Sequence, residues 1–347
     1  MFVAVAGMNL GLAEDLDIGG KRVARGSRAD FDLPVAASSD PATSIPVTVF
    51  HGAEPGPRIL ISAGIHGAEY VPVLAVQRLL SQIDAARLKG TVIIARVAHL
   101  SSFLRATVYY NPHDHKNLAR VFPGSASGTQ SERIAYVFTN ELLKNADALI
   151  DLHGGDATES LHPFVGVYGG ELAAKQYPLA KRIGLALGIP TLVRYRMDTK
   201  AQVDGNGRSP NRQAVADGKA TVLVEVGDRG RRDPKDVEML TSGLVNVLRV
   251  LHMLPEAGKP EPVPDVRWIA ETASVASTKT GIFYPLKEAG MDVRKGELAG
   301  YVTDLLGKTI EELRAPADGV ILYMPYAPPL NEGPSSPLVV GIPSKPE

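Results

Sequence analysis

The sequence predicts an α/β fold, in which a mostly parallel or mixed sheet is flanked by helices, followed by a small all-β domain. In the first two thirds of the chain, apolar runs alternate with amphipathic segments, and the runs are continuously apolar. Strands of that kind are buried on both faces, as in sheets covered by helices. Beyond a proline-rich stretch, the helical periodicity gives way to short β-like segments separated by Gly, Pro and Asp, which predicts the all-β part.

The first half of the α/β region predicts two strand–helix pairs. Arg58–Gly64 is a short apolar run that predicts a buried strand, and apolar residues at helical spacing predict a helix over Tyr70–Arg87. Thr91–Ala98 repeats the strand pattern, and Gln130–Lys144 repeats the helical pattern. Repeated strand–helix pairs are the building units of a sheet covered by helices.

The second half of this region continues the alternation. Ala146–Leu152 and Thr221–Val226 are apolar runs that predict two further strands. Leu172–Leu187 and Asp236–His252 show helical spacing of apolar residues and predict helices. The segment before Pro46 is rich in turn residues and predicts one or two antiparallel strands.

We expect four parts along the chain: an N-terminal arm and β-rich lead-in (1–45), the α/β domain (46–254), a linker (255–265) and the small all-β domain (266–347). The prolines of the linker cannot continue a helix or donate to a sheet, which makes it stiff. The apolar start has no Lys or Arg before Lys21, unlike a secretory signal. We therefore interpret it as an extension and expect a cytoplasmic protein.

The composition excludes several classes of function. The chain has 37 Lys and Arg against 38 Asp and Glu, so it lacks the excess of positive charge expected of a nucleic-acid-binding protein. It contains no apolar run of about 18 residues, which a membrane-spanning helix needs. It has no cysteine, which excludes disulfides, thiolate catalysis and Cys-ligated metals. Any metal site must therefore consist of His and carboxylate side chains.

Histidine and glutamate side chains follow three of the predicted strands. His66 and Glu69 come directly after the first strand, His153 follows another, and Glu225 lies near the end of the last. Ligands of open α/β sheets bind beyond the carboxyl ends of strands. We therefore expect these four side chains to share one site.

Two His and one Glu are the ligand set of a catalytic zinc whose fourth position is left to water. We expect His66, Glu69 and His153 to bind one zinc ion per chain, which lowers the pKa of its water to about 7. Glu225 is the candidate general base. Asp151 lies two residues before His153 and is a candidate to accept the N–H of a ligand imidazole, with His66 the preferred partner.

Four motifs follow one another along the chain: Gly64-Ile-His-Gly-Ala-Glu69, Asn117-Leu-Ala-Arg-Val-Phe-Pro-Gly124, Asp151-Leu-His-Gly-Gly155 and Val224-Glu-Val-Gly227. Together they resemble the succinylglutamate desuccinylase/aspartoacylase family, a branch of the zinc carboxypeptidase-like hydrolases. The resemblance covers most of residues 45–254, and the small β domain also suits that family. The ordered set is more specific than the His-x-x-Glu pair alone.

The resemblance implies hydrolysis of a linear amide, which converts a small N-acyl amino acid or related N-acyl amine into the free amine and a short carboxylate. It implies the same roles for the three metal ligands and for Glu225. By the same resemblance, Arg120 with Asn117 nearby holds the substrate carboxylate, which suits the planar fork of arginine. A further arginine that polarises the scissile carbonyl precedes this motif in the family, and Arg105 is the candidate here.

Part of the small β domain resembles the hammerhead of biotinyl and lipoyl carrier domains. Lys308 lies about where a carrier lysine would lie, but its neighbours are Gly307 and Thr309 rather than methionines. We interpret Lys308 as an exposed hairpin lysine on a reused fold. The domain is expected either to wall the active-site cleft or to form a contact between copies in a homo-oligomer.

Two other functions are compatible with the sequence. A zinc carboxypeptidase that trims the C-termini of peptides would use the same metal chemistry, but it needs an open groove. A non-catalytic binding or carrier protein would bind no metal and would carry a modification on Lys308. The complete His-Glu-His set favours an enzyme over the latter.

Overall fold

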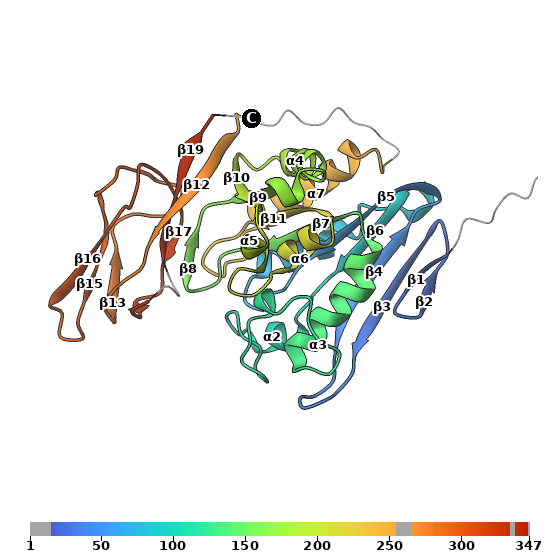
Figure 1. Cartoon of the computed structure of the whole chain (residues 1–347), viewed down its shortest axis with the longest axis horizontal. Helices are drawn as coiled ribbons and strands as arrows, with labels where there is room; N and C mark the ends of the chain where they lie inside the picture. Colours follow the sequence, from blue (N-terminus) through green and yellow to red (C-terminus); the bar gives the residue numbers. More distant parts are fainter. Residues whose placement is uncertain (1–14, 255–264, 334–336, 346–347) are drawn as a thin grey trace, which may run out of the picture.

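The computed structural model describes residues 15–254, 265–333 and 337–345 (Figure 1). The start of the predicted N-terminal arm and almost all of the predicted linker lie outside the described residues. The predicted fold class is confirmed, since a mixed sheet with flanking helices is followed by antiparallel β-structure.

The elements of the structure have the following bounds. The strands before residue 254 are β1 (Leu16–Ile18), β2 (Lys21–Val23), β3 (Ser27–Val35), β4 (Thr43–His51), β5 (Glu54–Ser62), β6 (Lys89–Ala95), β7 (Ala148–His153), β8 (Glu159–Leu161), β9 (Phe164–Gly169), β10 (Thr191–Arg196) and β11 (Ala220–Glu225). The α-helices are α1 (Tyr70–Leu79), α2 (Leu100–Arg105), α3 (Gln130–Val137), α4 (Tyr177–Ala186), α5 (Lys200–Asp204), α6 (Pro210–Ala216) and α7 (Pro234–Val250). The later strands are β12 (Arg267–Val275), β13 (Gly281–Pro285), β14 (Asp292–Val293), β15 (Leu298–Thr303), β16 (Thr309–Arg314), β17 (Gly319–Pro325), β18 (Pro329–Leu330) and β19 (Leu338–Ser344).

One sheet runs through the α/β region in the order β3–β4–β6–β5–β7–β11–β9–β10 and continues into β12. At its centre, β6, β5, β7 and β11 are parallel to one another, whereas β9 joins β11 in the antiparallel sense. β7 is buried along its whole length, which explains its continuously apolar sequence. The carboxyl ends of β5, β7 and β11 therefore lie side by side.

Helices cover both faces of this sheet (Figure 1). Ile59 and Ile61 of β5 belong to a core formed with α1, α4 and α7. Leu60, between them, belongs to a second core on the other face, which includes residues of α3 and α6. The alternation of neighbouring residues between two apolar layers is what buries both faces of a strand.

Three predicted helices differ clearly from the structure in their extent. The helix predicted over Leu172–Leu187 is α4, which begins at Tyr177 after a 3₁₀ turn (Glu171–Ala173). The helix predicted over Tyr70–Arg87 ends at Leu79, and a separate 3₁₀ turn (Ala85–Arg87) follows, where the Asp84 carboxylate accepts the N–H of Ala86 at 3.0 Å. The segment Gln130–Lys144 is helical throughout, but α3 passes into a π turn (Phe138–Leu142) and then a 3₁₀ turn (Leu143–Asn145).

β9 was not predicted, because its glycines weaken the strand pattern, and β10, which contains no glycine, was not predicted either. Gly166 of β9 lies under the ring of Tyr195 on β10, and a Cβ at position 166 would come within 2.3 Å of that ring. The glycine thus makes room for a neighbouring aromatic side chain. The helices α5 and α6, which follow β10, were also not predicted.

The C-terminal strands are joined to the α/β sheet at two places. β12 runs parallel to β10 over Thr191–Val193 and then pairs with β19, while β17 pairs with β8. A separate four-stranded sheet holds β13, β15, β16 and β18. Lys308 is exposed in the turn between β15 and β16.

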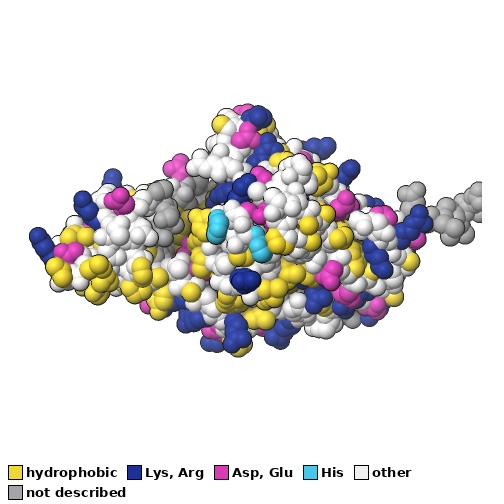
Figure 2. Space-filling model, turned by 90° about the horizontal axis from the view of Figure 1, so that it is seen from below, with side chains coloured by type: hydrophobic (Ala, Val, Ile, Leu, Met, Phe, Trp, Pro, Cys, Tyr) yellow, Lys and Arg dark blue, Asp and Glu magenta, His cyan; other side chains and the backbone are white. Residues whose placement is uncertain are grey.

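No helix among the described residues is long and apolar enough to span a membrane. On the face shown in Figure 2, acidic and basic side chains are interspersed and gather in no extended patch of one sign. This agrees with the formal net charge of −1. That face offers nucleic acid no continuous basic stripe.

Candidate metal centre and active site

The loop that carries two of the predicted ligands begins where β5 ends. Gly64 has a φ of +68°, in the left-handed region that glycine favours, and turns the chain out of the strand. Gly67 lies against the backbone of Ser102, where a Cβ would come within 2.2 Å of the carbonyl carbon. Its N–H donates to Ser102 Oγ at 3.1 Å. The two glycines therefore allow a tight turn into α1 that carries His66 and Glu69.

His66, Glu69 and His153 form a compact buried cluster. Glu69 Oε1 lies 2.7 Å from His66 Nδ1, and Glu69 Oε2 lies 2.9 Å from His153 Nδ1. The three residues are only 8%, 4% and 5% exposed. One possible ligand atom from each lies within 4.8 Å of the others. The structure therefore brings together the three residues predicted to bind the metal.

The far nitrogen of each imidazole meets an oxygen atom. His153 Nε2 lies 3.2 Å from Asp151 Oδ2, and Asp151 Oδ1 accepts a hydrogen bond from Ser62 Oγ at 2.6 Å. His66 Nε2 lies 3.1 Å from Asn117 Oδ1. Asp151 thus contacts a predicted ligand, but the preference for His66 as its partner was wrong. Asp151 and His153 share one face of β7, and Asn117 occupies the place beside His66.

These outer contacts fix the orientation of both rings. Carboxylate and amide oxygens accept hydrogen bonds, so a hydrogen on each Nε2 satisfies them and leaves each Nδ1 to face the cluster. Two imidazole nitrogens and one carboxylate around one point are the donor set of a catalytic zinc site. The chemistry of the donors and their tight spacing therefore fit a zinc ion.

Charges within the cluster interact strongly. Burial by itself would raise the pKa of Glu69, but the imidazoles of His66 and His153 outweigh it and lower that pKa to about 2. Burial disfavours protonation of His153, yet the carboxylates of Glu69 and Asp151 raise its pKa well above the ordinary value. In the absence of a metal, His153 therefore carries a proton that a bound cation must displace.

Glu225, the candidate general base, is the last residue of β11. It stands in register with His153 on the adjacent strand β7, so both side chains start from the same edge of the sheet. Burial raises the pKa of Glu225 well above its usual range; His153 opposes this shift and the charge of Glu69 adds to it. A cation held by the cluster would lower that pKa, because it stabilises the carboxylate.

Arg120 and Asn117 lie at the two ends of one short turn. Arg120 is exposed and ends the 3₁₀ turn Leu118–Arg120. Burial raises the pKa of Tyr323 to about 12, and the positive charge of Arg120 acts against this rise. Asn117 begins the turn, and its Oδ1 accepts the N–H of Ala119 at 2.8 Å in addition to meeting His66. Asn117 therefore supports a predicted ligand. Arg120 Nη1 donates to the Ala119 carbonyl at 2.8 Å, which leaves the other N–H groups of its exposed guanidinium for a ligand from solvent.

Arg105 is exposed at the C-terminal end of α2. Ala106 then adopts a left-handed conformation with a φ of +49°, which ends the helix and redirects the chain. Tyr109, four residues after Arg105, is the one that packs against the cluster: its ring centroid lies 5.1 Å from that of His66, edge to face. The assignment of Arg105 to the substrate carbonyl stays a prediction.

Three further residues near the cluster were not predicted as site residues. The hydroxyl of Tyr109 donates to the carboxylate of Glu159 at the start of β8. Tyr323, on β17 of the C-terminal region, lies near enough to Glu159 and Glu225 for both carboxylates to raise its pKa. The C-terminal strands therefore contribute a side chain to the surroundings of the cluster. No local pattern marks these residues, because their proximity depends on how distant segments pack.

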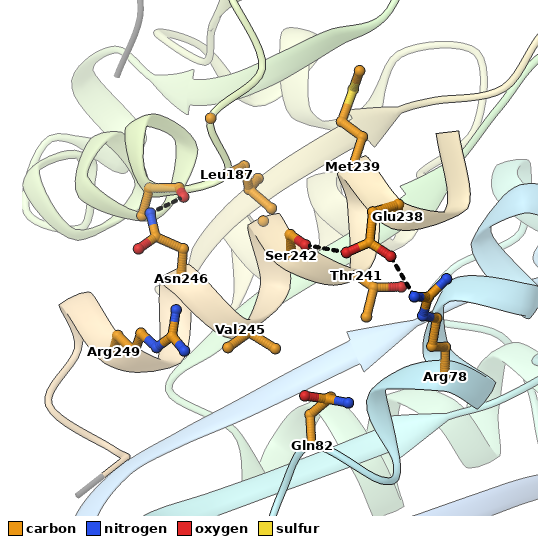
Figure 3. A pocket seen from close by; sticks show the side chains of 13 residues that line it. Arg78, Gln82, Leu187, Glu238, Met239, Thr241, Ser242, Val245, Asn246 and Arg249 are labelled. Atoms are coloured by element: carbon orange, nitrogen blue, oxygen red, sulfur yellow. Dashed lines mark hydrogen bonds and ion pairs between the residues drawn. The ribbon is translucent and has the colours of Figure 1, made fainter. Parts of the chain in front are cut away.

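Two surface hollows lie apart from the cluster. One, of about 390 Å³, lies between α1, α4 and α7 (Figure 3). Two of its charged groups pair with each other, since Glu238 lies 2.5 Å from Arg78, and Glu238 also accepts from Ser242 Oγ at 2.8 Å. The other, of about 500 Å³, lies beside β10 and β12. None of the three predicted metal ligands lines either hollow.

Comparison with known proteins places this geometry in context. Residues 55–251 match the succinylglutamate desuccinylase/aspartoacylase catalytic domain, a span that includes all four residues of the predicted centre. The chain is 32% identical over 298 residues to N-alpha-acetyl-L-2,4-diaminobutyric acid deacetylase of Halomonas elongata, and the alignment covers 84% of each protein.

Solved structures agree over nearly the whole chain. A product-bound structure of the ectoine utilization protein EutE (DoeB) from Ruegeria pomeroyi is 25% identical, with a TM-score of 0.79 and coverage of 96% of this chain and 97% of that one. A succinylglutamate desuccinylase/aspartoacylase from Rhodobacter sphaeroides is 22% identical, with a TM-score of 0.80 and coverage of 95% and 99%. The latter likeness concerns the fold.

Proposed function

Because the chain belongs to the succinylglutamate desuccinylase/aspartoacylase family, we propose that it is a zinc-dependent deacetylase of N-acetylated amino acids. Its activity class, hydrolysis of the amide C–N bond of an N-acyl amino acid, is that of the family and of the deacetylase relative. The zinc ion, the acetyl group and the roles of single residues are the proposal. The observation that carries it is the buried cluster of His66, Glu69 and His153.

The two Nδ1 atoms and the Glu69 carboxylate are the atoms that would hold the ion. When bound, zinc supplies Lewis acidity, which polarises a carbonyl group and lowers the pKa of water. Imidazole and carboxylate also accept cobalt, nickel and copper. Zinc is proposed because two His and one Glu match its catalytic sites. Asp151 and Asn117 hold the two imidazoles in the orientation that the ion needs.

Glu225 moves the proton in this proposal. As water adds to the acyl carbon and the new C–O bond forms, the Glu225 carboxylate accepts a proton from that water. As the C–N bond breaks, Glu225 returns the proton to the amine nitrogen and is a carboxylate again. The products are a free amine and a carboxylic acid, which becomes the carboxylate by releasing its proton to solvent. The position of Glu225 beside His153 supports this role.

Arg120 is proposed to bind the α-carboxylate of the substrate. Its side chain is exposed, and only its Nη1 is engaged, by the carbonyl of Ala119 at 2.8 Å, so the remaining donors of the guanidinium can meet a carboxylate. A paired hydrogen-bonding arrangement between arginine and a carboxylate fixes the position of the bound amino acid. Tyr323 of β17 would then limit the site from the side of the C-terminal region.

The test combines metal analysis with an assay of acetate release. Untagged protein should contain about one zinc ion per chain and should release acetate from N-acetyl amino acids. His153→Ala should lose both properties. His113→Ala, which alters an exposed histidine outside the cluster, should keep both. Wild-type protein that binds no metal even after zinc is supplied would refute the proposal.

The same samples distinguish the competing functions. Release of amino acids from peptide C-termini without release of acetate would support a zinc carboxypeptidase. A metal-free protein with a mass increment on Lys308 would support a carrier protein.

A further inference from the structure

Tyr109, Asp156 and Glu159 lie close together beside the metal cluster, and we call this group of residues the acidic pocket. We propose that this acidic pocket binds a primary ammonium group on the side chain of the substrate, so that the enzyme prefers N-acyl diamino acids. The inference rests on the proposed function and specifies which amino acid the site takes.

The acidic pocket adjoins the cluster through Tyr109. The ring of Tyr109 contacts the ring of His66, with centroids 5.1 Å apart at an interplanar angle of 82°. The hydroxyl of Tyr109 donates a hydrogen bond to the carboxylate of Glu159. Tyr109 has a φ of +64°, a conformation that costs free energy for a residue with a side chain and that recurs at functional sites. The strained residue thus links the predicted metal ligand to the carboxylate.

Asp156 supplies an unsatisfied buried oxygen. The residue is 1% exposed, and its Oδ1 accepts the N–H and the hydroxyl of Thr158, both at 2.7 Å. Asp156 Oδ2 is buried and has no hydrogen-bond partner among the described residues. A buried carboxylate oxygen without a donor is costly. It therefore points to a ligand that brings donors of its own.

No lysine or arginine of the described part of the chain pairs with Asp156 or Glu159. Arg229 is close, since its backbone N–H donates to the Glu159 carbonyl at 3.1 Å. Its guanidinium, however, is held by Asp228 at 3.2 Å and Glu288 at 3.3 Å. Burial raises the pKa of Glu159 to about 7, against the hydrogen bond from Tyr109, and the charge of Asp156 adds to the rise. Apart from the metal cluster itself, the acidic pocket thus has no counter-charge among the described residues.

A primary ammonium group matches what the acidic pocket offers. It carries one positive charge and three N–H donors, which suit two carboxylates and a phenol oxygen. A second metal ion fits less well, because the described residues contain a single group of three or more close His, Asp or Glu ligands, the cluster itself.

The distance also suits a diamino acid. From the acyl carbon to the side-chain nitrogen of an Nα-acyl 2,4-diamino acid there are five bonds of about 1.5 Å, which span about 6 Å. That length resembles the extent of Tyr109, whose ring touches His66 while its hydroxyl touches Glu159. Deacylation at the cluster and recognition at Glu159 are therefore compatible in one bound molecule.

The experiment compares two substrates of equal length. Nα-acetyl-L-2,4-diaminobutyrate ends in an ammonium group, and N-acetyl-L-homoserine ends in a hydroxyl group at the same position. We expect the wild-type kcat/KM to favour the diamino substrate by at least about tenfold, because hydrogen bonds to charged groups are the stronger ones. Glu159→Gln should lower kcat/KM for the diamino substrate, leave kcat/KM for the homoserine substrate unchanged, and so abolish most of this preference. Glu171→Gln, which alters an exposed carboxylate outside the acidic pocket, should keep the preference.

A binding measurement supplies a readout besides activity. Calorimetry on the zinc-loaded proteins should show tighter binding of L-2,4-diaminobutyrate than of L-homoserine, and Glu159→Gln should remove the difference. Metal analysis of the same samples should give equal zinc content for both proteins.

Several outcomes would overturn the inference without touching the proposed function. They are an unchanged preference in Glu159→Gln, an equal loss on both substrates, or a second zinc ion that disappears with Glu159. If the wild type hydrolyses neither these compounds nor other N-acetyl amino acids, the proposed function fails. The binding measurement then still decides whether the acidic pocket takes an ammonium group.

Discussion

The metal cluster and the acidic pocket lie side by side but differ in how their polar atoms are satisfied. In the cluster, Glu69 meets both imidazoles, and their outer nitrogens meet Asp151 and Asn117. In the acidic pocket, Asp156 Oδ2 has no partner among the described residues. Ligand side chains whose orientation is fixed by hydrogen bonds to their outer atoms are preorganised for a bound metal ion. An unsatisfied carboxylate oxygen instead needs a ligand that brings its own hydrogen-bond donors.

The largest expected effect separates the chemistry of the cluster from recognition in the acidic pocket. Glu225→Gln keeps the size of the side chain but cannot accept a proton. We expect kcat for deacetylation to fall about 10²–10⁴-fold, the usual contribution of a general base. Zinc content and the affinity for L-2,4-diaminobutyrate should change little, because Glu225 is assigned to neither. Steady-state kinetics, metal analysis and calorimetry measure the three quantities.

A Glu225→Gln protein that retains its kcat would remove this residue from the reaction. Loss of zinc in the variant would instead make Glu225 part of the metal centre. Glu171→Gln again serves as the control for the loss of one carboxylate.

The two regions were not equally predictable from sequence. His66, Glu69, His153 and Glu225 could be predicted because each comes directly after or at the end of an apolar strand, and the strand ends meet at one edge of the sheet. The contact of Tyr109 with Glu159 could not, since it joins segments fifty residues apart through a left-handed backbone conformation.

The same limit applies to the fold. Continuous apolar runs predicted β5, β6, β7 and β11, which are the parallel strands at the centre of the sheet. β9 could not be predicted, because Gly166 serves the packing of Tyr195 rather than any strand preference of its own. Asp151 was predicted in its general role but with the wrong partner. Which imidazole it meets depends on how Asn117 packs beside His66.

A smaller effect, on zinc affinity, is expected from a change of Asp151, which contacts the outer nitrogen of His153. Asp151→Asn removes the charge that orients His153, and we expect zinc affinity to fall about 10–100-fold. Competition with a chelator measures this change. Asp147→Asn, an exposed carboxylate just before β7, is the matched control and should leave zinc affinity unchanged.

Glu159→Gln is the informative comparison in the same assay. The acidic pocket should contribute little to metal binding, so this variant should hold zinc as the wild type does. An equal loss of zinc affinity in Asp151→Asn and Glu159→Gln would erase the distinction between the two regions.

The pH dependence of binding sharpens the comparison further. His153 has a raised pKa because of Glu69 and Asp151, so the metal-free cluster carries a proton at neutral pH. Zinc must displace it, and zinc affinity should therefore rise about tenfold per pH unit for each proton released, also above pH 7.

Binding of a diamine needs ionised Glu159, whose pKa is about 7 and is lowered by a nearby dication. In the zinc-loaded protein, diamine affinity should therefore be level at pH 7 and above, and should weaken only at lower pH, where Glu159 takes up a proton. Calorimetry in buffers of different ionisation enthalpy counts the protons, and a zinc affinity that is flat above pH 7 would mean that His153 is already neutral beside Glu69.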